Sequence, residues 1–154
     1  MPIRNLGHLF APRCVAVIGA SDRPSSVGRT VFQNLQRPDF AGRVYPINPR
    51  HEQLDGRPCY KSVADLPERP DLVVIATPAA TVPGLVRECG AAGAPSVIIL
   101  SAGFRETGPA GAALERAIQR EAAAFEGMRI LGPNCLGVLA PHAGLNASFA
   151  AGGP

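Results

Sequence analysis

The sequence predicts an α/β fold with a doubly wound, mainly parallel sheet and helices on both faces. Two observations carry this prediction. Short apolar runs alternate along the chain with helical patterns, and the third and fourth runs are apolar throughout. Runs without polar alternation indicate strands that are buried on both faces. The alternation of strand and helix favours parallel strands joined by helical crossovers, which is the Rossmann-like arrangement.

The apolar runs predict strands at 14–18, 43–47, 72–76, 96–100 and 128–131. Apolar residues at helical spacing between them predict helices over 27–35, 82–89 and 114–125. Ser25 or Ser26 is expected to cap the first helix, and Thr81 the second. Right-handed crossovers place the loops after the strands along one edge of the sheet. Ligands of such folds bind at that edge.

The chain of 154 residues is long enough for one domain with its own core. We expect that domain at residues 1–149 and a linker to a following domain at 150–154. No apolar run reaches the roughly 18 residues of a membrane span, and the first residues do not resemble a secretory leader. A cytoplasmic location is therefore expected.

The charge and the cysteines narrow the choice of ligand. A net charge of +3 with scattered arginines suits a phosphorylated small molecule better than a nucleic acid. The four cysteines are widely spaced and fit neither a metal site nor a disulfide framework. We expect no metal, no nucleic acid and no membrane as partners.

The loop over residues 19–29 is the first candidate for ligand binding. Gly19 permits a tight turn after the first strand, and Gly28 lets the backbone approach a ligand. Free N–H groups and the helix dipole at such a place favour an anion. An ordinary connection without a ligand is the alternative.

The end of the second strand argues against NAD. The first loop lacks the G-x-G-x-x-G pattern, and the strand ends in Asn48, Pro49 and Arg50 instead of an acid for the ribose hydroxyls. Arg50 is suited to pair with a ribose phosphate. Coenzyme A carries a 3′-phosphate and NADP a 2′-phosphate, so both ligands stay open on this ground.

The loops after the third and fourth strands supply further candidates. Thr77 and Pro78 are expected to form a stiff wall close to a ligand. Ser101, Ala102 and Gly103 follow the fourth strand, where a ligand tail would emerge. Glu106 in the same loop is interpreted as a solvated acid, with a general base as the alternative.

The loop over 132–137 combines two glycines with a proline, an amide and a thiol. Asn134 is a candidate donor to a carbonyl or a phosphate. Cys135 is either a nucleophile or a thiol that fills a small space. No histidine lies close to it in the sequence, and the nearest is His142. We assign no catalytic residue.

Taken together, these loops resemble the CoA-binding domain of the NDP-forming acyl-CoA synthetases. That superfamily includes succinyl-CoA synthetase and the ADP-forming acetyl-CoA synthetases, and the same module also occurs fused to GNAT-type protein acetyltransferases. The matching segments are 9–12, 15–21, 45–49, 76–79, 101–104 and 132–137. The order and spacing of the segments carry the resemblance, which covers nearly the whole chain.

The resemblance implies a coenzyme A site in this domain and phosphoryl transfer in other domains. It assigns CoA contacts to Ser21, Ser26, Val27, Gly28, Arg29, Arg50, Pro78 and Ser101. It places the 132–137 loop near the point where an acyl phosphate meets the CoA thiol. The family's phosphorylated histidine belongs to a following succinyl-CoA-synthetase-like domain, and nothing in this chain matches that segment or the ATP-grasp domain. His142 is not given that role.

The sequence therefore predicts a CoA-binding domain that does not complete the ligase reaction alone, from the N-terminal part of an ADP-forming acyl-CoA synthetase. An NADP-binding domain of an oxidoreductase and a stand-alone regulatory CoA-binding module are the alternatives. The expected cofactor-binding residues are Gly19, Ser21, Ser26, Val27, Gly28, Arg29, Asn48, Pro49, Arg50, Thr77, Pro78, Ser101, Ala102, Gly103 and Asn134.

Overall fold

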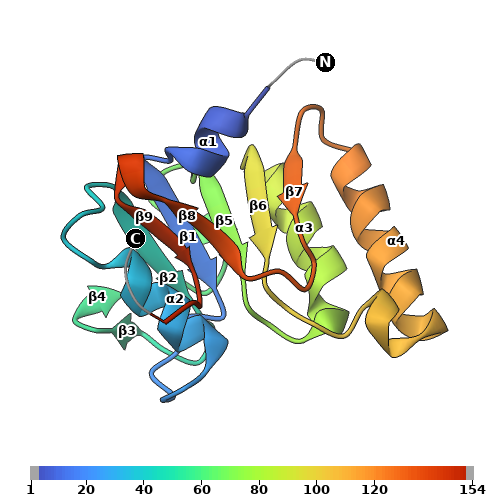
Figure 1. Cartoon of the computed structure of the whole chain (residues 1–154), viewed down its shortest axis with the longest axis horizontal. Helices are drawn as coiled ribbons and strands as arrows, with labels where there is room; N and C mark the ends of the chain where they lie inside the picture. Colours follow the sequence, from blue (N-terminus) through green and yellow to red (C-terminus); the bar gives the residue numbers. More distant parts are fainter. Residues whose placement is uncertain (1–3, 152–154) are drawn as a thin grey trace.

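A five-stranded sheet in the order β2-β1-β5-β6-β7 forms the centre of the protein (Figure 1). The computed structural model describes residues 4–151, and every strand pair of this sheet is parallel. The strands are β1 (Cys14–Ile18), β2 (Arg43–Ile47), β5 (Leu72–Ile75), β6 (Ser96–Ile99) and β7 (Arg129–Leu131). The predicted fold class is confirmed, with strand ends that differ from the prediction by a single residue.

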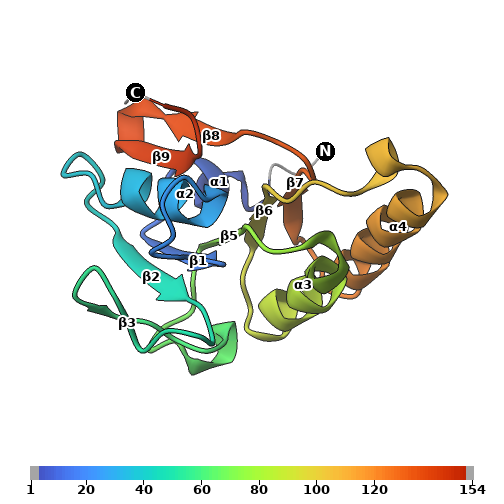
Figure 2. The same ribbon diagram turned by 90° about the horizontal axis from the view of Figure 1, so that it is seen from below.

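Helices cover both faces of the sheet. They are α1 (Leu6–Phe10), α2 (Val27–Leu35), α3 (Val82–Ala91) and α4 (Pro109–Ala123), with short 3₁₀ turns η1 (Val63–Asp65), η2 (Ala79–Thr81), η3 (Arg105–Thr107) and η4 (Pro141–Ala143). Figure 2 shows α1 and α2 on one face and α3 and α4 on the other. Within residues 4–151, no helix combines the length and apolar character that crossing a bilayer requires.

Alternate residues of the strands belong to two separate apolar cores, one on each face of the sheet. Val15 and Val17 of β1 pack with α1 and α2, whereas Ala16 and Ile18 pack with α3 and α4. All five residues of β1 are buried. The uninterrupted apolar runs in the sequence therefore have a direct cause, because both faces of the sheet are covered.

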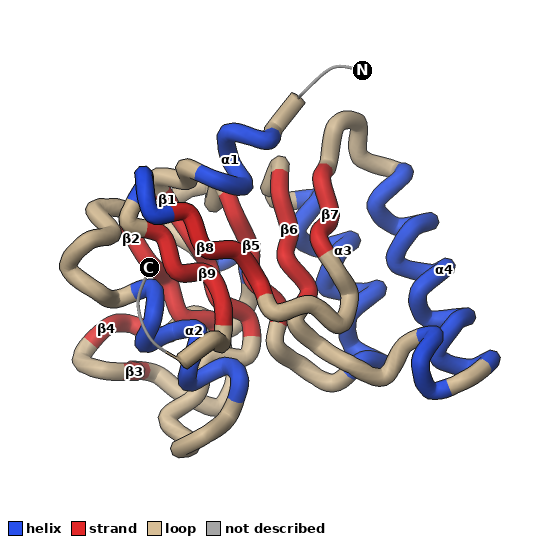
Figure 3. Tube along the Cα trace, in the orientation of Figure 1, coloured by secondary structure: helices blue, strands red, loops and turns tan. Residues whose placement is uncertain are grey.

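Two hairpins and one helix have no counterpart in the sequence-based prediction. These are α1, the hairpin of β3 (Gln53–Leu54) and β4 (Arg57–Pro58), and the hairpin of β8 (Gly137–Ala140) and β9 (Leu145–Ser148). The second hairpin packs on α2 and adds Leu145 and Ala147 to the core (Figure 3). The predicted boundary between domain and linker after residue 149 stays a prediction, and residues 152–154 lie outside the described residues.

The two predicted helix caps have different outcomes. The Ser26 hydroxyl accepts a hydrogen bond from the backbone N–H of Arg29 at 3.1 Å, so the cap of α2 is confirmed. Thr81 occupies the N-cap position of α3 as predicted, but its side chain makes no capping hydrogen bond. Its hydroxyl donates instead to the carbonyl oxygen of Pro78 at 2.6 Å, because η2 precedes α3 and continues directly into it.

The first turn of α2 lies directly against the end of β1. A Cβ added at Gly28 would meet the carbonyl oxygen of Gly19 well inside 3.0 Å, a separation that real Cβ contacts essentially never reach. Gly19 has a φ of +93°, which disfavours any side chain there. Both glycines are therefore required by the backbone at this contact.

We predict that Gly28→Ala lowers the free energy of unfolding by about 2 kcal/mol, because the methyl group meets backbone that cannot yield. Gly84→Ala is the matched control, since Gly84 also lies in a helix but its added Cβ would have no neighbour within 4 Å. The control should raise stability by about 0.5 kcal/mol through its higher helix propensity. Urea denaturation followed by circular dichroism measures both. Equal effects of the two substitutions would contradict this account of Gly28.

Candidate functional site

A groove of two adjoining cavities runs across the carboxyl ends of the central strands. The larger cavity has a volume of about 920 Å³ and the smaller of about 440 Å³. They share lining residues, which are Gly19, Ser21, Arg23, Ala76, Thr77 and Pro78. The loops after β1 and β5 therefore lie at the junction of the cavities. The groove occupies the edge at which doubly wound folds bind nucleotides.

The larger cavity is bordered by three exposed cationic side chains. Arg23 comes from the first loop, Arg50 follows β2, and Lys61 lies before η1. None of the three has an ion-pair partner among residues 4–151. Two acids, Asp22 and Glu88, line the same cavity. The unpaired cations leave it with positive charge available for a phosphate.

Asn48 connects the end of β2 to the first loop. Its side-chain Nδ2 donates to the carbonyl oxygen of Ala20 at 2.8 Å, and its Oδ1 accepts from the backbone N–H of Arg50 at 2.9 Å. Both an amide donor and an acceptor are used. An aspartate, which is the residue expected for NAD, lacks the donor. The amide at this position therefore braces the loop and fixes the backbone that carries Arg50.

The first loop is held by its own serines. Ser21 Oγ accepts from the N–H of Arg23 at 2.9 Å, and Ser26 Oγ donates to the carbonyl oxygen of Arg23 at 2.9 Å. The first N–H groups of α2, those of Val27 and Gly28, have no partner within the helix, and these residues line the smaller cavity. The loop thus presents backbone donors and the positive end of the helix dipole to the groove.

Hydrogen bonds tie together the loops that follow β5, β6 and β7. The N–H of Thr77 donates to Ser101 Oγ at 3.2 Å, and the N–H of Asn134 donates to the carbonyl oxygen of Ser101 at 2.9 Å. Ser101, Ala102 and Asn134 all line the smaller cavity. Three loops distant in sequence therefore form one wall.

Glu106 braces the loop after β6. Its Oε1 accepts hydrogen bonds from the backbone N–H groups of Gly103 and Phe104, the second at 3.0 Å. These bonds, that of Phe104 foremost, hold the pKa of Glu106 below its ordinary value. The carboxylate is thus occupied by its own loop, and it lines neither cavity. We interpret it as a structural brace and not as a general base.

Thirteen of the predicted binding residues line the groove, and Arg29 and Gly103 do not. The guanidinium of Arg29 contacts Asp55 in the turn between β3 and β4, with Nη1 at 2.8 Å from Oδ1. This hydrogen bond holds the pKa of Asp55 below its ordinary value. The side chain of Arg29 is therefore engaged away from the groove.

Several lining residues have no counterpart among the predicted binding residues. Arg23 lies inside the loop already identified, so its charge was a usable signal. Lys61 and Phe149 come from segments without a recognisable pattern. The unpredicted lining residues are Ile18, Asp22, Arg23, Ile47, His51, Lys61, Ser62, Val63, Ala76, Thr81, Leu85, Glu88, Leu100 and Phe149.

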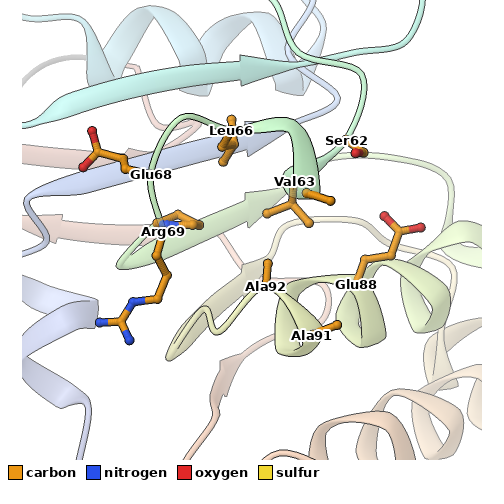
Figure 4. Close-up of a pocket in the computed structure, with 10 residues that line it drawn as sticks. Ser62, Val63, Leu66, Glu68, Arg69, Glu88, Ala91 and Ala92 are labelled. Atoms are coloured by element: carbon orange, nitrogen blue, oxygen red, sulfur yellow. The ribbon is translucent and has the colours of Figure 1, made fainter.

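A further hollow of about 680 Å³ lies between η1 and the end of α3 and shares Ser62, Val63 and Glu88 with the larger cavity (Figure 4). Its floor is apolar, but the acids Glu68 and Glu88 border it. Glu68 is held by the guanidinium of Arg43 and by the hydroxyl of Tyr45, which lies 2.6 Å away. Arg43, followed by Tyr45, lowers the pKa of Glu68 to about 2. Arg69 lines the same hollow, but no residue of the first loop or of the N-terminus of α2 does.

Cys135 lies behind the wall of the groove. Its thiol donates to the carbonyl oxygen of Ile99 at 3.3 Å and lines neither cavity. Burial raises the pKa of this thiol above its ordinary value. A nucleophile requires the opposite shift and access to the ligand. The geometry favours the interpretation of Cys135 as a thiol that fills a small space.

The sheet order, the glycine loop after β1 and the cationic cavity are those of a nucleotide-binding domain of the doubly wound class. Residues 13–141 match the model of the CoA binding domain family, and the chain belongs to that family. Coenzyme A is therefore the cofactor of this domain, in preference to NADP.

Relatives agree with this assignment. The chain is 44% identical to an ADP-forming acetate–CoA ligase I of Archaeoglobus fulgidus, over 92% of the chain and 20% of the relative. It is also 44% identical to the alpha subunit of an ADP-forming acetate–CoA ligase II of Pyrococcus furiosus, over 94% of the chain and 31% of the relative. The chain thus spans between a fifth and a third of the length of these relatives.

A solved structure shows the same fold. It is a dinucleotide-forming acetyl-coenzyme A synthetase 1 of Candidatus Korarchaeum cryptofilum in complex with phosphate and ADP. The chain matches it with a TM-score of 0.85 and 42% identity, over 94% of the chain and 30% of the synthetase.

The position of Cys135 leads to a chemical prediction. At neutral pH, iodoacetamide should modify Cys135 about tenfold more slowly than free glutathione, because the thiol is protonated and buried. Peptide mass spectrometry after timed labelling measures this rate. Cys135→Ser should keep the affinity for CoA within about twofold, because a hydroxyl still donates to Ile99. Rapid labelling together with loss of CoA binding in the serine variant would restore the nucleophile interpretation.

Proposed function

We propose that coenzyme A lies along the groove with its nucleotide half in the larger cavity and its pantetheine arm in the smaller. The distribution of charge is the observation that carries this orientation. Arg50 and Lys61 line only the larger cavity, and Arg23 lies at the junction. The smaller cavity has no other charged lining residue among those described. The ribose 3′-phosphate is therefore assigned to the cavity that holds Arg50.

The diphosphate of the cofactor is assigned to the junction of the cavities. The first loop lines both cavities there, and the N-terminus of α2 lines the smaller cavity beside it. Backbone N–H groups at a helix start favour phosphate oxygens. Arg23 borders both cavities and supplies a charge. Thr77 and Pro78 form the facing side of the junction. An extended ligand that crosses this junction contacts both walls.

The smaller cavity suits the pantetheine arm. Its lining combines apolar groups, such as Pro78 and Leu100, with the hydroxyl of Ser101 and the amide of Asn134. Pantetheine likewise combines an apolar dimethyl group with two amides that need hydrogen-bond partners. In this orientation the thiol end of the arm lies towards the loop that carries Asn134.

We further propose that the longer protein is an ADP-forming acyl-CoA synthetase that forms an acyl-CoA such as acetyl-CoA. The activities of the two ligase relatives support this proposal. In such a protein this domain holds CoA, and the following succinyl-CoA-synthetase-like and ATP-grasp domains supply the phosphoryl chemistry. A cytoplasmic location belongs to the same proposal and is supported by the four free thiols.

Titration calorimetry tests the phosphate assignment. CoA should bind the chain about tenfold more tightly than dephospho-CoA, because a charge-assisted contact to Arg50 is lost. Arg50→Ala should weaken the binding of CoA by about the same factor and leave the affinity for dephospho-CoA unchanged. Arg13→Ala removes the same charge immediately before β1, at the opposite edge of the sheet, and is the matched control.

Two outcomes would contradict the proposal. Micromolar binding of NADP without binding of CoA would overturn the assigned ligand. Equal losses of affinity for CoA and for dephospho-CoA in Arg50→Ala would show that Arg50 does not contact the 3′-phosphate.

A further inference from the structure

Phe149 is an aromatic wall of the smaller cavity that comes from outside the loops of the sheet. It directly follows β9, the second strand of the hairpin that packs on α2 (Figure 1). Its backbone N–H donates to the carbonyl oxygen of Leu136 at 3.3 Å. Its ring is half-buried against the core that includes Leu100 and lines the cavity together with Asn134.

A buried polar cluster fixes the backbone on both sides of Phe149. Asn34 of α2 donates through Nδ2 to the carbonyl oxygens of Ser148 at 2.9 Å and Ala150 at 3.2 Å. The hydroxyl of Ser148 accepts from the N–H of Ala150 at 3.2 Å and donates to Asn146 at 2.6 Å. Asn34, Asn146 and Ser148 are all buried. Because both neighbours are held from α2, the backbone of Phe149 is held beside the cavity.

The surface beside Phe149 is apolar and open. Val27 at the start of α2 lines the same cavity and is 40% exposed. Pro78, Leu100 and Ala102 complete an apolar lining. Such a surface gains from contact with the apolar part of a ligand.

We infer that Phe149 packs against the pantetheine arm and makes the protein distinguish CoA from ligands that share only its nucleotide half. This inference rests on the proposed orientation of CoA in the groove. Phe149 is then a specificity-determining residue supplied by the hairpin, and the hairpin is part of the binding site.

Calorimetry with CoA and with 3′,5′-ADP tests the inference. The compound 3′,5′-ADP is the nucleotide half of CoA without the second phosphate of the diphosphate and without pantetheine. Phe149→Ala should weaken CoA about tenfold, because ring contact with the arm is lost. It should leave 3′,5′-ADP within about twofold of the wild-type value. The CoA affinity of Phe149→Leu should lie between those of the wild type and of Phe149→Ala. Leu139→Ala is the control, since Leu139 lies on β8, is 46% exposed and lines neither cavity.

The outcomes separate this inference from the proposed function. Unchanged CoA affinity in Phe149→Ala would overturn the inference and leave the CoA site intact. An equal loss for CoA and 3′,5′-ADP would also overturn it, because Phe149 would then act through the fold. Failure of the wild-type chain to bind CoA would overturn the proposed function, and the inference with it.

Discussion

The groove depends on the contact between the backbone of Gly19 at the end of β1 and the first turn of α2 at Gly28. A Cβ on Gly28 would overlap the carbonyl of Gly19, and one on Gly19 would overlap the carbonyl of Ala76 after β5. Three backbone segments therefore meet without side chains between them. Because of this contact, the N–H groups at the start of α2 lie at the floor of the groove, where a phosphate can reach them.

The surrounding loops are held by hydrogen bonds before any ligand arrives. Asn48 bonds to Ala20, Thr77 bonds to Ser101, and Asn134 bonds to Ser101. Each bond joins loops that follow neighbouring strands of the sheet. Preorganisation of this kind reduces the ordering free energy that binding would otherwise require. The three cations at the larger cavity stay exposed, so the positive charge is available while the backbone around it is fixed.

The sheet was predictable because its signal is continuous. A strand such as Leu72–Ile75, covered on both faces, must be apolar at every position, and β1 shows the same pattern. The β8–β9 hairpin was not predictable, because its strands are short and carry Gly137, Asn146 and Ser148. Asn146 and Ser148 are buried, and Asn34 of α2 donates to the carbonyl oxygen of Ser148. Such tertiary pairing leaves no trace in local sequence.

The site residues likewise divide into those with a local sequence signal and those whose role depends on the fold. Glycines and the N-cap serine of the first loop have local causes, so the sequence located them. The roles of Arg29 and Arg23 required the fold, because the structure gives Arg29 an ion-pair partner in Asp55 and leaves Arg23 facing the groove. Phe149 entered the site only through the hairpin, which the sequence did not predict.

The central claim is that CoA occupies this groove across the ends of the strands. Amide chemical shifts of the isotope-labelled chain, followed during titration with CoA, test it most directly. The account predicts that the largest changes fall on Gly19, Val27, Gly28, Ser101 and Asn134, with the residues of α4 unaffected. Changes centred on Leu66, Ala91 and Ala92, which line only the hollow beside η1, with the first loop unaffected, would place the ligand in that hollow and contradict the account.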